Sequence, residues 1–164
     1  MIEAVIFDLD GTLIHLPIDY ERLFQEFGKI MKTNDVRPLT DKVSRLDYRT
    51  RKKIFEAWDK LELSALKHMT VNEEGMSLYE EFSRIPKALV TLQGRALVQN
   101  VLTRLCLSFD FAITREDNLD RVMQLQIATQ RLEIQSQNVL LVGNTEEDNL
   151  AARKVGCQFL RVKE

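Results

Sequence analysis

Two acidic residues near the N-terminus, Asp8 and Asp10, have the types and spacing that point most directly to chemistry. They follow an unbroken apolar run at residues 4–7, which is typical of a strand covered on both faces in a parallel sheet. Gly11 and Thr12 come next and indicate the turn that leaves this strand. Ligands bind open parallel sheets at the carboxyl ends of the strands, so the pair predicts an active-site edge. Two buried carboxylates side by side need a compensating cation or donors, and a divalent metal is the simplest answer.

The residues around this pair form a longer signature. The sequence FDLDGTL at residues 7–13 resembles the first motif of the haloacid dehalogenase superfamily, most of whose members are phosphatases. The resemblance implies that Asp8 is the nucleophile that takes the phosphoryl group, and that Asp10 acts as general acid and base. On residue types alone a turn-capping role for both acids stays open, because Asp often precedes Gly in turns.

The order of apolar patterns along the chain predicts a doubly wound α/β fold with a small helical insertion. Apolar residues at three- and four-residue spacing predict helices after the first strand, with Thr40 and Asn72 as caps of two of them. Short apolar runs separated by helical patterns then bring the total to about five strands, a pattern typical of a doubly wound parallel sheet. We therefore expect a Rossmann-like core at residues 1–17 and 85–164 and a helical cap at residues 18–84, the layout that the resemblance also implies.

A second family motif is a hydroxyl residue at the end of the second core strand. Thr91 fits that place and is followed by Leu92, where many relatives have a small polar residue. The resemblance implies that the Thr91 hydroxyl and nearby backbone N–H groups, with Leu92 among these positions, bind the phosphoryl oxygens.

A third family motif is a lysine before the next helix, and it is altered here. No lysine occurs in the segment 114–121. Arg121 lies nearest to the expected place and Arg115 is the reserve, and either guanidinium can bind phosphate oxygens in a bidentate manner. A solvated arginine at the start of a helix is the alternative.

The fourth motif, VGNTEED at residues 142–148, resembles the metal-binding motif of the family. In that motif Gly-Asp is followed four residues later by a second Asp, so Asn144 replaces the first acid and Asp148 matches the second. An amide oxygen is a hard ligand like a carboxylate but carries no charge. Thr145 with Asp148 also forms a capping-box pattern that starts a helix without any metal, and the two roles of Asp148 are compatible.

Length and composition exclude several other classes of protein. With 164 residues, 45% of them hydrophobic, the chain can form one well-packed domain with a modest appendage but not two large domains. A formal net charge of −2 gives no field that would attract nucleic acid or an anionic membrane. The chain has only two cysteines and no apolar run long enough to span a bilayer, so we expect a cytoplasmic protein. Nothing in the sequence indicates an oligomeric state.

These motifs together predict a magnesium-dependent phosphatase for a small phosphorylated metabolite, of the phosphoglycolate-phosphatase-like kind. The resemblance implies that Mg²⁺ is held by Asp8, the backbone carbonyl of Asp10, and Asn144 or Asp148. Asp8 would attack phosphorus to form an aspartyl phosphate, and Asp10 would protonate the leaving group and then activate water. The altered motifs leave open a catalytically degenerate member that binds a phosphorylated ligand or a partner. A phosphotransferase is a further alternative, whereas a dehalogenase fits less well because it needs no second acid at Asp10.

Overall fold

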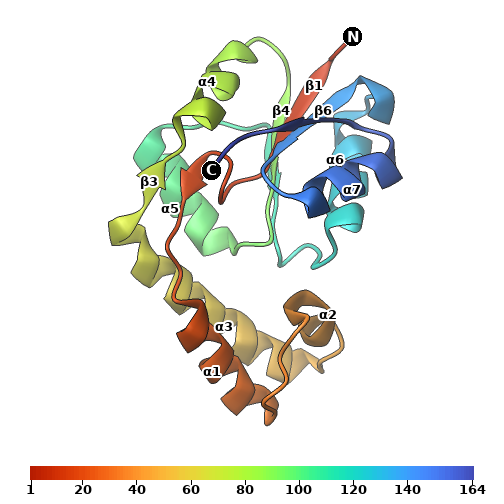
Figure 1. The fold of residues 1–164 in the computed structure, drawn as a ribbon. Coiled ribbons are helices and arrows are strands. Elements are labelled where there is room, and N and C mark those ends of the chain that lie inside the picture. The colour runs from red at the N-terminus through yellow and green to blue at the C-terminus, as the bar shows by residue number, and fades with distance from the viewer.

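The computed structural model describes residues 1–164 and is built around a five-stranded parallel sheet (Figure 1). The strands are β1 (Ala4–Phe7), β4 (Lys87–Val90), β5 (Phe111–Ile113), β6 (Val139–Gly143) and β7 (Gln158–Arg161). Their order in the sheet is β5-β4-β1-β6-β7, so the chain builds outward from central β1 to one edge and then crosses to the other side. The doubly wound α/β fold expected from the sequence is confirmed.

Alternation of side chains along the central strand β1 explains why its sequence is apolar throughout. In β1, Val5 and Phe7 point into the larger hydrophobic cluster, whereas Ala4 and Ile6 point into the smaller one on the opposite face. Helix α5 (Arg95–Leu105) covers the first face, and α6 (Arg121–Leu132) with α7 (Glu146–Val155) covers the second. A strand covered on both faces has no solvent side on which to carry polar residues.

Three helices form a separate layer at the lower end of the molecule in Figure 1, here called the α1–α3 layer: α1 (Tyr20–Met31), α2 (Leu39–Ser44) and α3 (Tyr48–Ala65). Within it the rings of Phe27 and Trp58 pack edge to face with centroids 5.4 Å apart. Residues of this layer share one hydrophobic cluster with β1, β4 and α5, so the layer has no core of its own.

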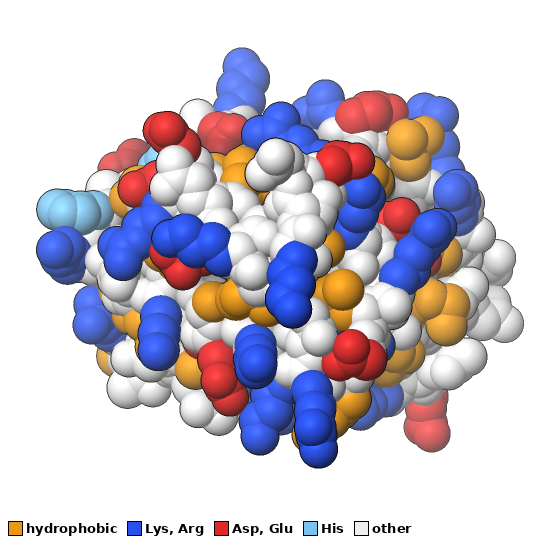
Figure 2. All heavy atoms as spheres, turned by 90° about the horizontal axis from the view of Figure 1, so that it is seen from below, with side chains coloured by type: hydrophobic (Ala, Val, Ile, Leu, Met, Phe, Trp, Pro, Cys, Tyr) orange, Lys and Arg blue, Asp and Glu red, His pale blue; other side chains and the backbone are white.

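The face seen from below carries charged side chains, many of them Lys and Arg, with small hydrophobic areas between them (Figure 2). No helix has both the length and the apolar character needed to cross a membrane.

The segment between the α1–α3 layer and β4 returns to the sheet. After a 3₁₀ turn, η1 (Leu66–His68), β3 (Thr70–Val71) pairs antiparallel with β2 (Ile14–His15), a small ladder that the sequence patterns did not predict. Helix α4 (Glu73–Glu81) then lies against the core, where the Tyr79 ring packs 5.5 Å from that of Phe109. The predicted cap, residues 18–84, includes α4, which lies outside the α1–α3 layer. The cap boundaries at residues 18 and 84 stay a prediction. A second 3₁₀ turn, η2 (Ser136–Asn138), precedes β6.

One of the two predicted helix caps is confirmed and the other is wrong. Helix α2 begins after Pro38 without a side-chain cap, and Thr40 lies inside it. Asn72 caps α4, because its Oδ1 accepts hydrogen bonds from two backbone N–H groups of the first turn. Its Nδ2 also donates to the carbonyls of Gly11 and Lys163, at 3.3 and 2.8 Å. Asn72 therefore joins α4 to the turn after β1 and to the C-terminal segment.

Replacing Asn72 by Ala should destabilise the protein more than removing an ordinary helix cap. We expect Asn72→Ala to lower the free energy of unfolding by about 2 kcal/mol, because a cap and two further hydrogen bonds are lost together. Asp47→Ala removes the cap of α3, which bonds only to Thr50, and should cost about 1 kcal/mol. Urea denaturation of the two variants measures the difference, and equal losses would contradict the joining role of Asn72.

Candidate active site

The predicted site residues lie at the carboxyl ends of three neighbouring strands. Asp8 directly follows β1, Thr91 follows β4 and Asn144 follows β6. These strands are adjacent and parallel, with Phe7 level with Leu89 on one side and Val142 on the other. The sheet topology therefore brings together residues that are more than a hundred positions apart in the chain.

Asp8 carries a charge that the surrounding protein solvates poorly. Its side chain is buried, and this burial raises the pKa of Asp8 to about 7, with Arg121 opposing the shift and Asp148 adding to it. Asp10 is less deeply buried, and its Oδ1 accepts a hydrogen bond of 2.9 Å from the Leu16 N–H. Burial also raises the pKa of Asp10 above its usual value. Both acids thus hold protons more tightly than exposed aspartates, which suits Asp10 to a proton-transfer role.

The guanidinium of Arg121 lies between the two buried acids of the site. Its Nη2 is 3.4 Å from Asp8 Oδ1 and its Nε is 3.3 Å from Asp148 Oδ1. Nη1 donates to the Val90 carbonyl at 3.1 Å, which fixes the plane of the group. Arg121 is the first residue of α6, and Asp120 caps that helix through the Val122 N–H. Of the two arginines considered as replacements for the family lysine, the structure places Arg121 at Asp8.

Arg115, the reserve candidate for binding phosphate, has other partners. Its side chain is fully buried and forms ion pairs with Asp59 and Glu62 of α3. Because these carboxylates occupy the guanidinium, the geometry does not support phosphate binding by Arg115.

Most backbone N–H groups of the loop at residues 91–94 donate to an acceptor within the protein. The Thr91 N–H bonds to β5, and the Gln93 N–H donates to Thr91 Oγ1 at 3.1 Å. The Gly94 N–H donates to Glu62 Oε1 at 3.0 Å. Leu92 alone has an N–H that donates to no acceptor in the protein. The Thr91 hydroxyl donates to Gln93 Oε1 at 3.5 Å, so it can serve an anion only by turning away from Gln93. The Leu92 N–H is therefore the donor of this loop that is free for an anion.

Asn144 and Asp148 occupy the start of α7 in the predicted capping arrangement. Asp148 Oδ2 accepts from the N–H groups of Asn144 and Thr145, and Thr145 Oγ1 accepts from the Asp148 N–H. The other carboxylate oxygen faces Arg121, so the capping role and a role in the site coexist. Asn144 Oδ1 accepts from the Thr12 hydroxyl at 3.3 Å. Gly11 has a φ of +83°, and a Cβ there would overlap the Asn144 amide, so this turn requires glycine.

The oxygen ligands around Asp8 fit a magnesium ion. The protein has no group of three or more His, Cys, Asp or Glu side chains that could hold a metal. Mg²⁺ needs fewer acids, because it usually binds through one or two carboxylates and retains several waters. Asp8 and Asp148 would supply the carboxylates, and the Asn144 amide and the Asp10 carbonyl would supply neutral oxygens. The raised pKa of Asp8 shows that its negative charge remains undercompensated beside Arg121.

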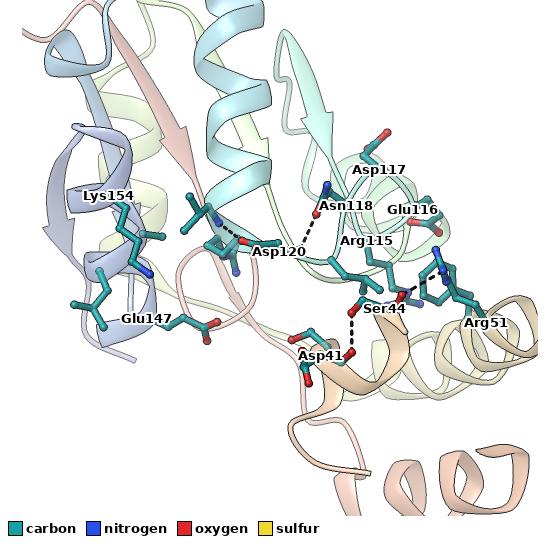
Figure 3. A pocket seen from close by; sticks show the side chains of 17 residues that line it. Asp41, Ser44, Arg51, Arg115, Glu116, Asp117, Asn118, Asp120, Glu147 and Lys154 are labelled. Carbon is teal, nitrogen blue, oxygen red and sulfur yellow. Dashed lines mark hydrogen bonds between the residues drawn. The ribbon is translucent and has the colours of Figure 1, made fainter. Parts of the chain in front are cut away.

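A polar cleft of about 610 Å³ opens beside these residues, between the α1–α3 layer and the core (Figure 3). Its walls come from α2, the N-terminal half of α3, the loop from Arg115 to Val122, and α7. In Figure 3 Asp41 lies on one side of the cleft, with Glu147 and Lys154 on the other, whereas Arg51 lies farther along α3 and donates to the Ser44 carbonyl. Arg121 also lines the cleft, whereas Asp8, Asp10 and Thr91 do not. The guanidinium of Arg121 thus joins the cleft to the acidic pair.

Gln124 is a residue of this region that the sequence motifs missed. Its buried Nε2 lies within hydrogen-bond distance of the carbonyls of Thr91, Thr114 and Asn118, at 2.9, 3.1 and 2.8 Å, and its two protons are shared among them. These bonds tie the loops after β4 and β5 to α6, next to Arg121. A polar residue on the buried face of an apolar helix was the only signal in the sequence. The buried carboxylate of Glu62 was missed for the same reason.

Comparison with known proteins gives a consistent family assignment. The family model described as haloacid dehalogenase-like hydrolase matches residues 5–162. A phosphoglycolate phosphatase from Neisseria gonorrhoeae is 28% identical over 185 aligned positions, covering 95% of this chain and 78% of that protein. An uncharacterized hydrolase from Saccharomyces cerevisiae is also 28% identical, covering 99% and 78% of the two chains.

Solved structures show the same fold at lower sequence identity. A haloacid dehalogenase-like hydrolase from Streptococcus pneumoniae aligns with a TM-score of 0.70 and 20% identity, over 98% of this chain and 84% of that one. CbbY from Rhodobacter sphaeroides in complex with phosphate aligns with a TM-score of 0.69 and 16% identity, over 100% and 87%.

The pKa of Asp8 predicts a pH dependence of stability. The folded pKa, about 7, lies above the ordinary value of 3.8, so the folded protein binds more protons than the unfolded chain between these two values. The stabilisation that protonated Asp8 provides is complete below the ordinary pKa and is lost as the pH rises toward about 7.

Without metal, we expect the free energy of unfolding of the wild type to fall as the pH rises from 3.8 to about 7. This fall should be larger than that of Asp8→Asn by up to about 4 kcal/mol. Denaturant unfolding from pH 4 to 8 with a chelator measures it. Parallel curves for the two proteins would contradict the raised pKa. Added Mg²⁺ should reduce the difference between the curves, because a bound cation favours the ionised form.

Proposed function

Because the chain belongs to the haloacid dehalogenase-like hydrolase family, we propose that it hydrolyses phosphate monoesters of small metabolites through an aspartyl phosphate on Asp8, with Mg²⁺ as cofactor. Family membership and the phosphoglycolate phosphatases among its relatives make it a phosphoric monoester hydrolase. The intermediate, the metal and the residue roles are our proposal. A cytoplasmic location and a capping role for residues 18–84 belong to it as well.

The observation that carries the proposal is the buried Asp8 carboxylate beside the guanidinium of Arg121. A carboxylate can attack a phosphate dianion only if nearby positive charge offsets the repulsion between them. Arg121 supplies one such charge, and the oxygen ligands of Asp8, Asp148 and Asn144 fit a divalent cation. Together these positive charges would offset the repulsion between the Asp8 carboxylate and the phosphate dianion.

In the proposed reaction the chain's own groups bind, orient and transfer protons. An oxygen of Asp8 attacks phosphorus in line with the leaving oxygen, while Asp10 donates its proton to that oxygen. Asp10, now ionised, removes a proton from the water that hydrolyses the aspartyl phosphate. The Thr91 hydroxyl, the Leu92 N–H and Arg121 would bind the phosphoryl oxygens. Mg²⁺ held by Asp8, the Asp10 carbonyl, Asn144 and Asp148 would supply the remaining neutralisation of phosphate charge.

The cleft beside Arg121 is a suitable place for the leaving group. Its walls carry both acidic and basic side chains, so it fits a small polar metabolite better than an apolar one. In this proposal the α1–α3 layer contributes one wall and thereby selects the substrate.

A catalytically degenerate binding protein is the second candidate. The observation that favours it is Asn144 in place of an acid, which leaves the site with only two carboxylates facing Arg121. Such a protein would bind a phosphorylated ligand without turning it over.

Hydrolysis of 4-nitrophenyl phosphate with and without Mg²⁺ separates the two candidates. We expect metal-dependent turnover that falls to background in Asp8→Asn, because the nucleophile is removed. Asp110→Asn is the matched control, because Asp110 lies just before β5, at the amino ends of the parallel strands, whereas Asp8 lies at their carboxyl ends. Mass spectrometry after acid quenching should show one phosphoryl group on the wild type and none on Asp8→Asn. Folded wild-type protein that binds phosphate but never turns over would support the degenerate alternative.

Substitutions of Arg121 test its role as the cation beside the nucleophile. Arg121→Met should lower kcat/KM about 100-fold, the effect of losing one donor aimed at the transition-state charge. Arg121→Lys keeps the charge but not the forked geometry, and should recover about tenfold of that loss. Steady-state kinetics of the three proteins measures this order, and equal activity of Arg121→Met and the wild type would exclude Arg121 from phosphate binding.

A further inference from the structure

A buried ion cluster links α3 to the core at a place that the proposed reaction does not use. Arg115 Nη1 lies 2.8 Å from Glu62 Oε2, and neither side chain is exposed to solvent. Asp59, one turn earlier on α3, pairs with Nη2 of the same guanidinium. The cluster thus contains one cation and two anions, with only Asp59 partly exposed.

Aromatic rings hold the guanidinium in a single position. Its central carbon lies 4.3 Å from the centroid of Trp58 and 5.6 Å from that of Phe55. Ion pairs on two sides and rings on another leave Arg115 little freedom to move. Buried ion pairs often stabilise a protein no better than apolar residues of similar volume, so stability alone does not explain this arrangement.

The cluster bonds directly to the backbone of the phosphate loop at residues 91–94. Glu62 Oε1 accepts from the Gly94 N–H at 3.0 Å, and Arg115 Nη1 donates to the Leu92 carbonyl at 3.5 Å. The Arg115 N–H also donates to the Gln93 carbonyl at 3.2 Å. A Cβ on Gly94 would overlap both Asp59 and Arg115, so the loop and the cluster are in close contact.

These bonds determine which donors the loop presents. Gly94 and Gln93 direct their N–H groups to Glu62 and Thr91, and the Leu92 N–H is left without a protein partner. If the Gly94 N–H lost its acceptor, the adjoining peptides could rotate and the Leu92 N–H would no longer have a fixed direction. The orientation of an anion-binding donor therefore depends on a carboxylate from a different layer of the molecule.

We propose that Glu62 is a positioning residue for the phosphatase reaction: its hydrogen bond to Gly94 fixes the loop so that the Leu92 N–H points at the phosphoryl group. The proposal rests on the proposed function. It also means that the α1–α3 layer shapes the phosphate site itself, in addition to lining the cleft.

The test compares two variants that both lack the buried ion pair. Glu62→Met/Arg115→Met removes the charges of Glu62 and Arg115 and the acceptor for the Gly94 N–H. Glu62→Gln/Arg115→Met removes the same two charges and keeps an amide oxygen as acceptor. Both variants leave Asp59 in place, partly exposed to solvent, so its charge does not distinguish them. Inorganic phosphate in the presence of Mg²⁺ is the probe, titrated by calorimetry. Thermal unfolding followed by circular dichroism establishes that each variant is folded at the temperature of the titration.

We expect the Met/Met variant to bind phosphate about tenfold more weakly than the wild type, which corresponds to about 1.4 kcal/mol. The Gln/Met variant should bind within about threefold of the wild type, because the hydrogen bond to Gly94 is retained. A purely structural role would instead lower the melting temperature of both variants and leave phosphate affinity unchanged. Glu62→Met alone serves in place of the Met/Met variant if that double variant does not fold.

The outcomes separate this inference from the proposed function. Equal phosphate affinity in the wild type and both folded variants would overturn the positioning role and leave the proposed function intact. Equal weakening in both double variants would also overturn it, because the loss would then follow the charges instead of the acceptor. A folded wild-type protein that binds no phosphate would overturn the proposed function, and this inference with it.

Discussion

The arrangement of the site depends on one electrostatic constraint, the burial of the Asp8 carboxylate next to that of Asp148. Two anions at this depth repel each other strongly, and burial raises the pKa of Asp8 to about 7 even with Arg121 in place. The start of α6 places Arg121 between the two acids, and the capping box of α7 holds Asp148 by backbone N–H groups. Helix starts on one face of the sheet thus position both the cation and the second acid.

The same constraint connects the site to the rest of the molecule. An anionic group that enters where the strands end meets Arg121, which lies between Asp8 and Asp148, and the Leu92 N–H of the loop at residues 91–94. That loop is fixed from two sides, by Gln124 of α6 and by Glu62 of α3. Because the α1–α3 layer shares a hydrophobic cluster with the sheet, the Glu62 contact is supported by packing along α3. Charge, hydrogen bonding and apolar burial therefore act on the same few residues.

Local patterns in the sequence were sufficient for the elements and for part of the site. The apolar runs predicted the strands, because a strand covered on both faces cannot carry polar residues. Asn72 and the Thr145–Asp148 pair were identified as caps from residue types alone, since such caps bond within a few positions. The prediction failed at Thr40, because the helix begins after Pro38, two residues earlier than the pattern indicated. The strand-end positions of Asp8, Thr91 and Asn144 also followed from the sequence, because parallel strands share an edge.

The fold class, the strand-end acids and two of the three predicted caps could be predicted from the sequence, because they depend on contacts between near neighbours or on a general rule for parallel sheets. Which of Arg121 and Arg115 lies beside Asp8 could be seen only in the folded chain, because each arginine takes partners from distant segments: Asp8 in the first case and Glu62 in the second. The tertiary structure also placed α4 against the core and Gln124 among three carbonyls. The pairing of buried polar groups depends on which segments come into contact in the folded chain, and residue spacing along the chain does not predict these contacts.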